Sequence, residues 1–226
     1  MNRRMFALLT MATVAIGSLF VSNGVTTAGA VASSTNHTIS ITTGGTCTNF
    51  FCYTPAKLSI FQADTVTWKN TTTVAHTATT CSTSACSGVG SGTGTDAAFN
   101  SGLINPGATF THQFHGRGTY NYYCQIHGYA LMHGTITVLA FAVKTSTLPG
   151  GTVGKAYSAQ LTTNGGKSPF VWTLVTGSTP GGLKLSSGGR ISGTPTRTGS
   201  STFTVKVSDS SLPRLTAQKA LTIKVA

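Results

Sequence analysis

The chain has 226 residues, which is enough for one large domain or two small ones, each with a core of its own. Gly, Thr and Ser are abundant, Glu is absent, and the Leu-rich, charge-laced periodicity of surface helices is missing, so the composition argues against a helical fold and favours an all-β one. The formal net charge is +12 at pH 7, and only three residues are acidic.

The first 32 residues predict an export signal peptide. Two arginines, Arg3 and Arg4, precede an apolar run over 6–21, and small residues follow around 28–32. We expect removal of this segment, although the run is close to the lower length limit for an uncleaved membrane anchor. The arginine pair leaves both the general and the twin-arginine export routes open. The mature protein is therefore expected to be secreted or extracytoplasmic, in solution or associated with the cell surface.

Short alternating segments follow the signal over 33–139. Apolar and polar residues alternate in them with a period of two, which is typical of half-buried strands. A Ser/Gly/Thr-rich stretch over 79–95 predicts a long loop. The expected strands cover 37–43, 58–61, 64–70, 109–114, 118–124 and 134–138. Short alternating strands of this kind, with loops between them, predict a β-sandwich.

The segment 140–226 differs from 33–139 in charge and in chemistry. Between 33 and 139 three bases face two acids, a net charge of +1, whereas ten bases after residue 140 face only Asp209, a net charge of +9. All His, Cys and Met residues end at His133. Alternating strands at 203–207 and 221–225, with Gly-Gly pairs as turns, predict a second, smaller β domain. Trp172 is expected in its core rather than on a sugar-stacking surface.

The basic second domain favours an anionic partner, either a cell-wall polymer or a membrane surface. A Lys-rich face that only keeps the domain soluble is the simpler alternative. Export argues against a nucleic-acid partner, although non-specific binding in vitro is expected of so basic a chain.

Five cysteines in an exported chain leave one thiol unpaired. Cys47 and Cys52 are five residues apart, as are Cys81 and Cys86, so local pairing is the simplest of the three connectivities that four cysteines allow. Every such pairing leaves Cys124 free for chemistry. A buried inert thiol and an intermolecular bridge are the alternatives for a lone Cys, and the neighbours of Cys124 argue against both.

The segment from Cys124 to Met132 places a thiolate, an imidazole (His127) and a thioether on one loop between two strands. Thiolate and thioether favour Cu(I), and a trigonal His₂Cys set with a weak axial Met is the geometry of blue-copper electron transfer. His76, in the loop after strand 64–70, is the expected second histidine ligand. Zinc is the alternative for Cys and two His, but Met is a poor zinc ligand. Met132 is also the only Met after the signal, which favours a ligand over core filler.

Four other histidines compete for the imidazole role. His112 and His115 are expected on a strand surface, and His133 is expected to point away from Met132 if the following strand has begun. His37 begins the first predicted strand. The favoured metal ligands therefore remain His76, Cys124, His127 and Met132.

Several motifs resemble the plastocyanin and halocyanin group of cupredoxins over about 37–139. They are Asp64-Thr-Val-Thr-Trp-Lys-Asn70, His76-Thr, Phe99-Asn-Ser-Gly102, Gly118-Thr-Tyr-Asn-Tyr-Tyr-Cys124 and the Cys-x2-His-x4-Met loop. The resemblance implies a Greek-key β-sandwich with one type 1 copper at one end, and it assigns the same four ligands.

Two features depart from that family pattern. Thr77 follows the first His where several relatives have Asn, which leaves open the hydrogen bond that orients the thiolate loop. The loop from Cys81 to Cys86 looks like an insertion that could shield or reshape the rim of the site.

The second domain resembles the immunoglobulin-like (He_PIG-type) repeats of secreted bacterial proteins over about 146–226. The motifs are Thr152-Val-Gly154-Lys-Ala-Tyr157, Pro169-Phe-Val-Trp172, Gly182-Leu183-Lys-Leu185 and Ile191-Ser-Gly-Thr-Pro195. This resemblance implies a smaller immunoglobulin-like β-sandwich and a surface location more than an activity.

The combined prediction is an exported blue copper protein that transfers single electrons, with a redox partner docking near His127 against 128–131. One alternative is a copper-binding or delivery protein without a dedicated redox partner. Another is a cell-surface binding protein that uses the basic domain as a wall anchor. A copper enzyme is disfavoured, because such enzymes need further histidine clusters and 140–226 contains no His, Cys or Met.

Overall fold

A computed structural model describes residues 34–44, 47, 49–82, 85–87 and 90–226. The predicted export signal, 1–32, lies outside the described residues. Every regular element in the described part of the chain is a β-strand, so the all-β prediction is confirmed. Within the same residues there is no helix long and apolar enough to cross a membrane.

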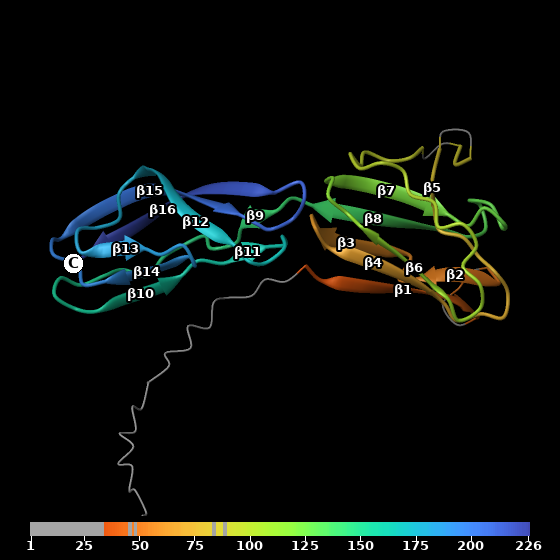
Figure 1. Cartoon of the computed structure of the whole chain (residues 1–226), viewed down its shortest axis with the longest axis horizontal. Coiled ribbons are helices and arrows are strands. Elements are labelled where there is room, and N and C mark those ends of the chain that lie inside the picture. Colours follow the sequence, from red (N-terminus) through yellow and green to blue (C-terminus); the bar gives the residue numbers. More distant parts are fainter. Residues whose placement is uncertain (1–33, 45–46, 48, 83–84, 88–89) are drawn as a thin grey trace, which may run out of the picture.

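The first domain is a sandwich of two four-stranded sheets (Figure 1), ordered β2-β1-β4-β6 and β3-β8-β7-β5. Strands β1 and β4 pair in parallel, as do β3 and β8, so the chain crosses between the sheets instead of forming successive hairpins. The strands are β1 (Asn36–Thr43), β2 (Phe51–Thr54), β3 (Lys57–Phe61), β4 (Thr65–Asn70), β5 (Thr79–Thr80), β6 (Thr109–Gln113), β7 (Gly118–Tyr123) and β8 (His133–Leu139).

The alternation in these strands turns one face of each sheet into a shared core. Trp68 of β4 is fully buried there and packs on the rings of Phe99, Phe110 and Tyr122. Cys124 and Met132 belong to the same core cluster. The predicted ligand loop is therefore anchored in the hydrophobic core and does not lie loosely on the surface.

The second domain contains sheets ordered β12-β15-β16 and β10-β14-β13 and the short pair β11-β9. Leu183 and Ile191 from one sheet pack with Phe203, Val205 and Ile223 from the other in one core. Trp172 is 4% exposed in this core, which confirms the core assignment. The strands are β9 (Ala142–Val143), β10 (Tyr157–Gln160), β11 (Thr163–Asn164), β12 (Val171–Gly177), β13 (Leu183–Leu185), β14 (Arg190–Gly193), β15 (Gly199–Ser208) and β16 (Thr216–Val225).

Gln62 links the two domains through hydrogen bonds. Its backbone N–H donates to the carbonyl of Leu139 at 2.9 Å, and its own carbonyl accepts from the N–H of Gly166 at 3.1 Å. Its side-chain Oε1 accepts from the N–H of Phe141 at 3.0 Å, and its Nε2 donates to the carbonyl of His115 at 2.6 Å. The backbone and side chain of this one residue thus link the first domain, the connecting segment and the second domain.

Strand β8 connects this junction to the predicted metal ligands. It begins at His133, directly after Met132, and ends at Leu139, beside Gln62. The ligand loop therefore lies at the end of the first domain that faces away from the second domain (Figure 1).

Candidate metal centre

Three of the four predicted ligands converge at this end of the sandwich. The Nδ1 atom of His127 lies 3.3 Å from Sγ of Cys124, and Nδ1 of His76 lies 3.9 Å from the same sulfur. The ligand atoms of the three residues lie within 4.8 Å of one another. The two imidazole rings are stacked with their centroids 5.0 Å apart. The structure therefore forms a compact His/Cys/His cluster from residues 51 positions apart in sequence.

Turn hydrogen bonds shape the loop that carries Cys124, His127 and Met132. The N–H of Gly128 donates to the carbonyl of Cys124 at 2.9 Å, and the carbonyl of Gly128 accepts from the N–H of Met132 at 3.1 Å. Gly128 has φ of 76°, in the left-handed region that favours glycine. The glycine thus lets the chain reverse tightly enough to return Met132 to the core.

Met132 closes the base of the loop. Its carbonyl accepts the N–H of Cys124 at 3.0 Å, and its side chain is 1% exposed in the same core cluster as the thiol. Met132 and His127 also line one pocket of about 240 Å³ together with Asn49, Phe50, Phe51 and Leu131. The fourth predicted ligand therefore lies beside the other three.

A side-chain network orients the ring of His76, which is fully buried. Nε2 of His76 lies 3.0 Å from the hydroxyl of Thr72. That hydroxyl has acceptors of its own in the side-chain oxygen of Asn70 at 2.8 Å and the carbonyl of Val74 at 3.0 Å, so its oxygen accepts from the His76 N–H. The proton on Nε2 leaves Nδ1 free to face Cys124, which is the orientation that a metal ligand requires.

The protonation of His76 also suits a metal ligand. Burial, and to a lesser degree the neighbouring His127, lower the pKa of His76 to about 4. The imidazole is therefore neutral at physiological pH and keeps its Nδ1 lone pair.

Thr77, which stands where several relatives have Asn, makes hydrogen bonds that orient the thiolate loop. Its backbone N–H donates to Sγ of Cys124 at 3.3 Å, and its hydroxyl accepts from the N–H of Gln125 at 2.8 Å. The hydroxyl of Tyr53 donates to the Thr77 carbonyl. Threonine therefore supplies a side-chain link between the His76 segment and the thiolate loop at this position.

Both predicted disulfides form with local pairing, and Cys124 is the free, buried cysteine. The bonds join Cys47 to Cys52 and Cys81 to Cys86. Two such bonds indicate an oxidising compartment and agree with an extracellular protein.

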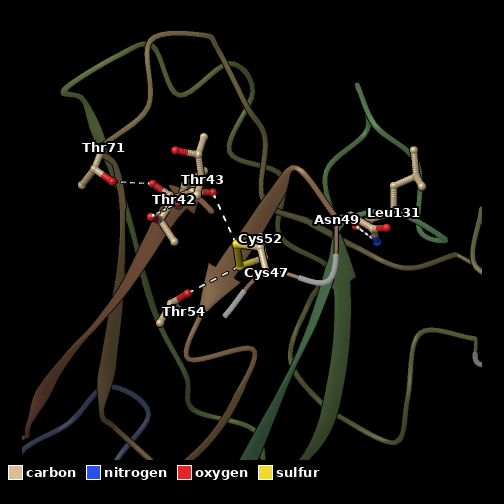
Figure 2. The surroundings of a disulfide bond; sticks show 9 residues. Thr42, Thr43, Cys47, Asn49, Cys52, Thr54, Thr71 and Leu131 are labelled. Atoms are coloured by element: carbon tan, nitrogen blue, oxygen red, sulfur yellow. Dashed lines mark hydrogen bonds between the residues drawn. A yellow bond between two sulfur atoms is a disulfide. The ribbon is translucent and has the colours of Figure 1, made fainter. Parts of the chain in front are cut away.

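The first disulfide loop contacts the metal centre, which the sequence did not reveal. The ring of Phe51 lies 4.7 Å from the ring of His76 and 5.0 Å from that of His127. The side-chain amide of Asn49 donates to the carbonyl of Leu131 at 2.9 Å, as Figure 2 shows. The sequence carries little signal for these contacts, because they join residues between 25 and 82 positions apart and no motif relates them.

The second disulfide loop lies elsewhere. The N–H of Cys81 donates to the carbonyl of Asn121, at the middle of β7, and Gly94 donates to Thr119 further along the same strand. The segment thus covers the open edge of the β3-β8-β7-β5 sheet. The described residues of this loop bond along the sheet edge and do not line the pocket beside His127 and Met132, while 83–84 lie outside the described residues, so the expectation that the loop reshapes the rim stays a prediction.

Two of the other histidines, His37 and His133, make hydrogen bonds away from the cluster. His37 lies 3.0 Å from the carboxylate of Asp64, and Nδ1 of His133 lies 2.8 Å from the carbonyl of Tyr129. His112 corrects a prediction, because it pairs with Val66 on the inward side of β6 and packs against Phe99 and Phe114. It is a partly buried residue of the aromatic core, and not the strand-surface histidine that was expected.

Apolar side chains surround the metal centre at the surface. Phe50, Ile126 and Leu131 are 77%, 54% and 54% exposed. The described residues of the segments that build this end, 43–44, 47, 49–56, 70–78, 97–108 and 124–133, include no Asp, Glu, Lys or Arg. We call these three residues, Phe50, Ile126 and Leu131, the apolar rim. The segments that flank the apolar rim carry no formal charge.

The fold and this site define a cupredoxin-type metal-binding domain, and comparisons with known proteins agree. Residues 39–139 match the family model described as copper binding proteins, plastocyanin/azurin family, and residues 139–226 match the model described as "Putative Ig domain". Two consecutive segments of the chain therefore match a copper-binding family and an immunoglobulin-like family, in the order that its two sets of motifs predict.

Solved structures with similarity to part of the chain include two cupredoxins. A purple cupredoxin from Nitrosopumilus maritimus is 29% identical, with a TM-score of 0.36, over 46% of this chain and 99% of that protein. A reduced mutant of amicyanin is 22% identical, with a TM-score of 0.35, over 49% of this chain and 88% of that protein. A comparison with curated proteins found no match.

The donor set fits copper. A buried thiol, two imidazole nitrogens within 4.8 Å of it and an adjacent thioether are soft or borderline ligands, and the cluster contains no carboxylate. Hard cations such as Ca²⁺ and Mg²⁺ require oxygen ligands and are not suited to this site.

Proposed function

We propose that the protein binds one type 1 copper ion through His76, Cys124, His127 and Met132 and passes single electrons between redox partners. The observation that carries this proposal is the convergence of two imidazole Nδ1 atoms on the one free thiol, 3.3 and 3.9 Å away. Bound copper supplies reversible one-electron chemistry between Cu(I) and Cu(II).

The residues around the ligands favour fast electron transfer by restricting their movement. Thr72 fixes the ring of His76, Thr77 donates to the thiol, and the N–H of Cys124 is bonded to the Met132 carbonyl. Phe51 packs against both imidazoles. Ligands held in this way keep nearly the same positions in both oxidation states, so that little reorganisation opposes the transfer.

The proposed exit for the electron is His127, the more exposed of the two histidines. Of the predicted docking segment 128–131, Ala130 and Leu131 are exposed, and Phe50 and Ile126 extend the apolar surface around it. A redox partner would dock on this apolar rim, with little dependence on salt because the surrounding segments lack formal charge.

Copper loading tests the proposal directly. The mature protein is titrated with Cu(II), and its visible and EPR spectra are recorded. We expect an intense thiolate-to-copper band at one copper per chain, lost in Cys124→Ser and altered in Met132→Leu. A colourless copper complex would reject the type 1 site.

Electron transfer is separated from copper delivery by a second measurement. A rapid electron self-exchange rate with slow loss of copper to a competing chelator supports the redox role. Slow self-exchange with ready copper transfer to an acceptor supports delivery instead. The disulfides support a secreted or extracytoplasmic location for either role.

A further inference from the structure

The acidic residue of the second domain is withdrawn from the surface. Asp209 is 2% exposed. Its carboxylate accepts hydrogen bonds from the N–H groups of Lys167 at 3.0 Å, Ser211 at 3.2 Å and Leu215 at 2.8 Å, and from the Ser211 hydroxyl at 2.8 Å. The carboxylate thus stabilises a turn and does not neutralise a surface cation.

The two acidic residues of the first domain are engaged in the same way. Asp64 is 2% exposed and accepts from the N–H groups of Thr35 and Phe61 as well as contacting His37. Asp96 accepts from the N–H groups of His115 and Gly116 at 2.7 and 2.5 Å. Across the part of the chain that the structure describes, the one ion pair is that of His37 with Asp64, so no Lys or Arg is paired with a carboxylate.

The unpaired cations of the second domain lie on both of its outer faces. Eight of its ten Lys and Arg residues are exposed. Lys184 and Arg190 alternate with the buried Leu183 and Ile191, so they lie on the outer face of the β10-β14-β13 sheet.

Lys206 and Lys224 occupy the corresponding positions on the other sheet. They alternate with the buried Val205, Val207, Ile223 and Val225 on β15 and β16. Because the inner faces of the two sheets share one core, their outer faces point in opposite directions. The positive charge, half-buried at Lys206, therefore lies on two opposite faces of the domain instead of forming a single flat patch.

We propose that the second domain binds a flexible anionic polymer, rich in phosphate or carboxylate groups, outside the cell. A planar lipid surface contacts one face of a sandwich at a time, whereas a flexible chain can follow both. Unpaired cations on such a domain release the counterions of a polyanion on binding, and no exposed Asp or Glu side chain of the domain opposes them. The domain acts as an electrostatic anchor, and the Gln62 junction leaves the metal centre at the far end of the molecule.

The experiment measures binding of the full mature protein to long-chain inorganic polyphosphate and to polygalacturonate, as phosphate and carboxylate probes, and to vesicles with anionic headgroups. Two double variants each remove the two positive charges of one face. They are Lys184→Gln with Arg190→Gln and Lys206→Gln with Lys224→Gln. The matched control, Lys57→Gln with Lys69→Gln, removes two exposed cations from the first domain.

We expect each face variant to weaken polymer binding on the order of tenfold at low salt. The negative slope of log K against the logarithm of the salt concentration should become shallower by about 1.4, near 0.7 for each cation removed. The control is expected to leave both quantities unchanged. An equal loss of polymer affinity in all three variants, or the absence of polymer binding at low salt, overturns the proposal. Stronger binding to vesicles, with loss confined to one face variant, overturns it in favour of a membrane surface. An unchanged thiolate-to-copper band in every variant keeps the result independent of the copper proposal.

Discussion

The side-chain amide of Asn49 donates to the carbonyl oxygen of Leu131 at 2.9 Å, which ties the loop closed by the Cys47–Cys52 disulfide to the loop of the predicted ligands (Figure 2). Phe51, next to Cys52, packs against both ligand histidines. The disulfide thus restrains a segment that forms one wall of the metal centre.

Removing this disulfide is expected to weaken copper retention as well as folding. Cys47→Ser with Cys52→Ser frees a short loop, which costs about 2 kcal/mol in the chain-entropy model, and it loosens the Phe51 wall. We expect a lower melting temperature and a several-fold faster loss of copper to a chelator.

The chain provides a matched control for that experiment. Cys81→Ser with Cys86→Ser removes a disulfide of the same sequence separation beside β7, away from the metal centre. It should cost similar stability without changing copper release. If both pairs accelerate copper release equally, the first loop has no specific role at the site.

Thr77 provides a second test, of the link between the His76 segment and the thiolate loop. Thr77→Val removes the hydroxyl that accepts from Gln125 at 2.8 Å and keeps the N–H that donates to Cys124. We expect a loss of about 1 kcal/mol in the free energy of unfolding, measured with urea on the copper-free protein. Thr77→Ser, which keeps the hydroxyl, should retain that stability. An unchanged midpoint in Thr77→Val would show that the side-chain bond contributes nothing.

The copper-free protein should become less stable in acid, and His112 should contribute. Burial lowers the pKa of His112, with the carboxylate of Asp96 opposing that shift. Because the native state then binds fewer protons than the unfolded chain, this contribution is complete above the unfolded pKa of about 6.5 and is lost as the pH falls below it. His112→Phe suits the contacts with Phe99 and Phe114. The variant should show a flatter dependence of unfolding free energy on pH below about 6.5, and an unchanged slope would contradict the assignment.

The loop of candidate ligands from Cys124 to Met132 and the disulfides could be predicted because their information is local, whereas His76 comes from a segment 48 residues away. The Cys-x2-His-x4-Met spacing and two cysteine pairs five residues apart can be recognised without knowing the fold. The Phe51 wall could not, because it depends on the register of β2 with β1 and on where the ligand loop returns. The surface expectation for His112 is wrong although the sequence contains the contrary signal, because alternation puts His112 on the same side of the strand as Phe110 and Phe114.

The last prediction concerns the apolar rim. Leu131→Glu places a carboxylate on an uncharged surface beside His127, so that two copies of the protein repel each other when they meet at this face. We expect the electron self-exchange rate of the copper-loaded protein, measured by NMR line broadening in mixtures of its two oxidation states, to fall about tenfold or more at low salt. The unmodified protein should show little dependence on salt, because the segments around the site carry no formal charge. Leu212→Glu is the control, because Leu212 is 88% exposed in the second domain. If the two variants slow self-exchange equally, electrons do not leave through the rim, and the role proposed for His127 fails with it.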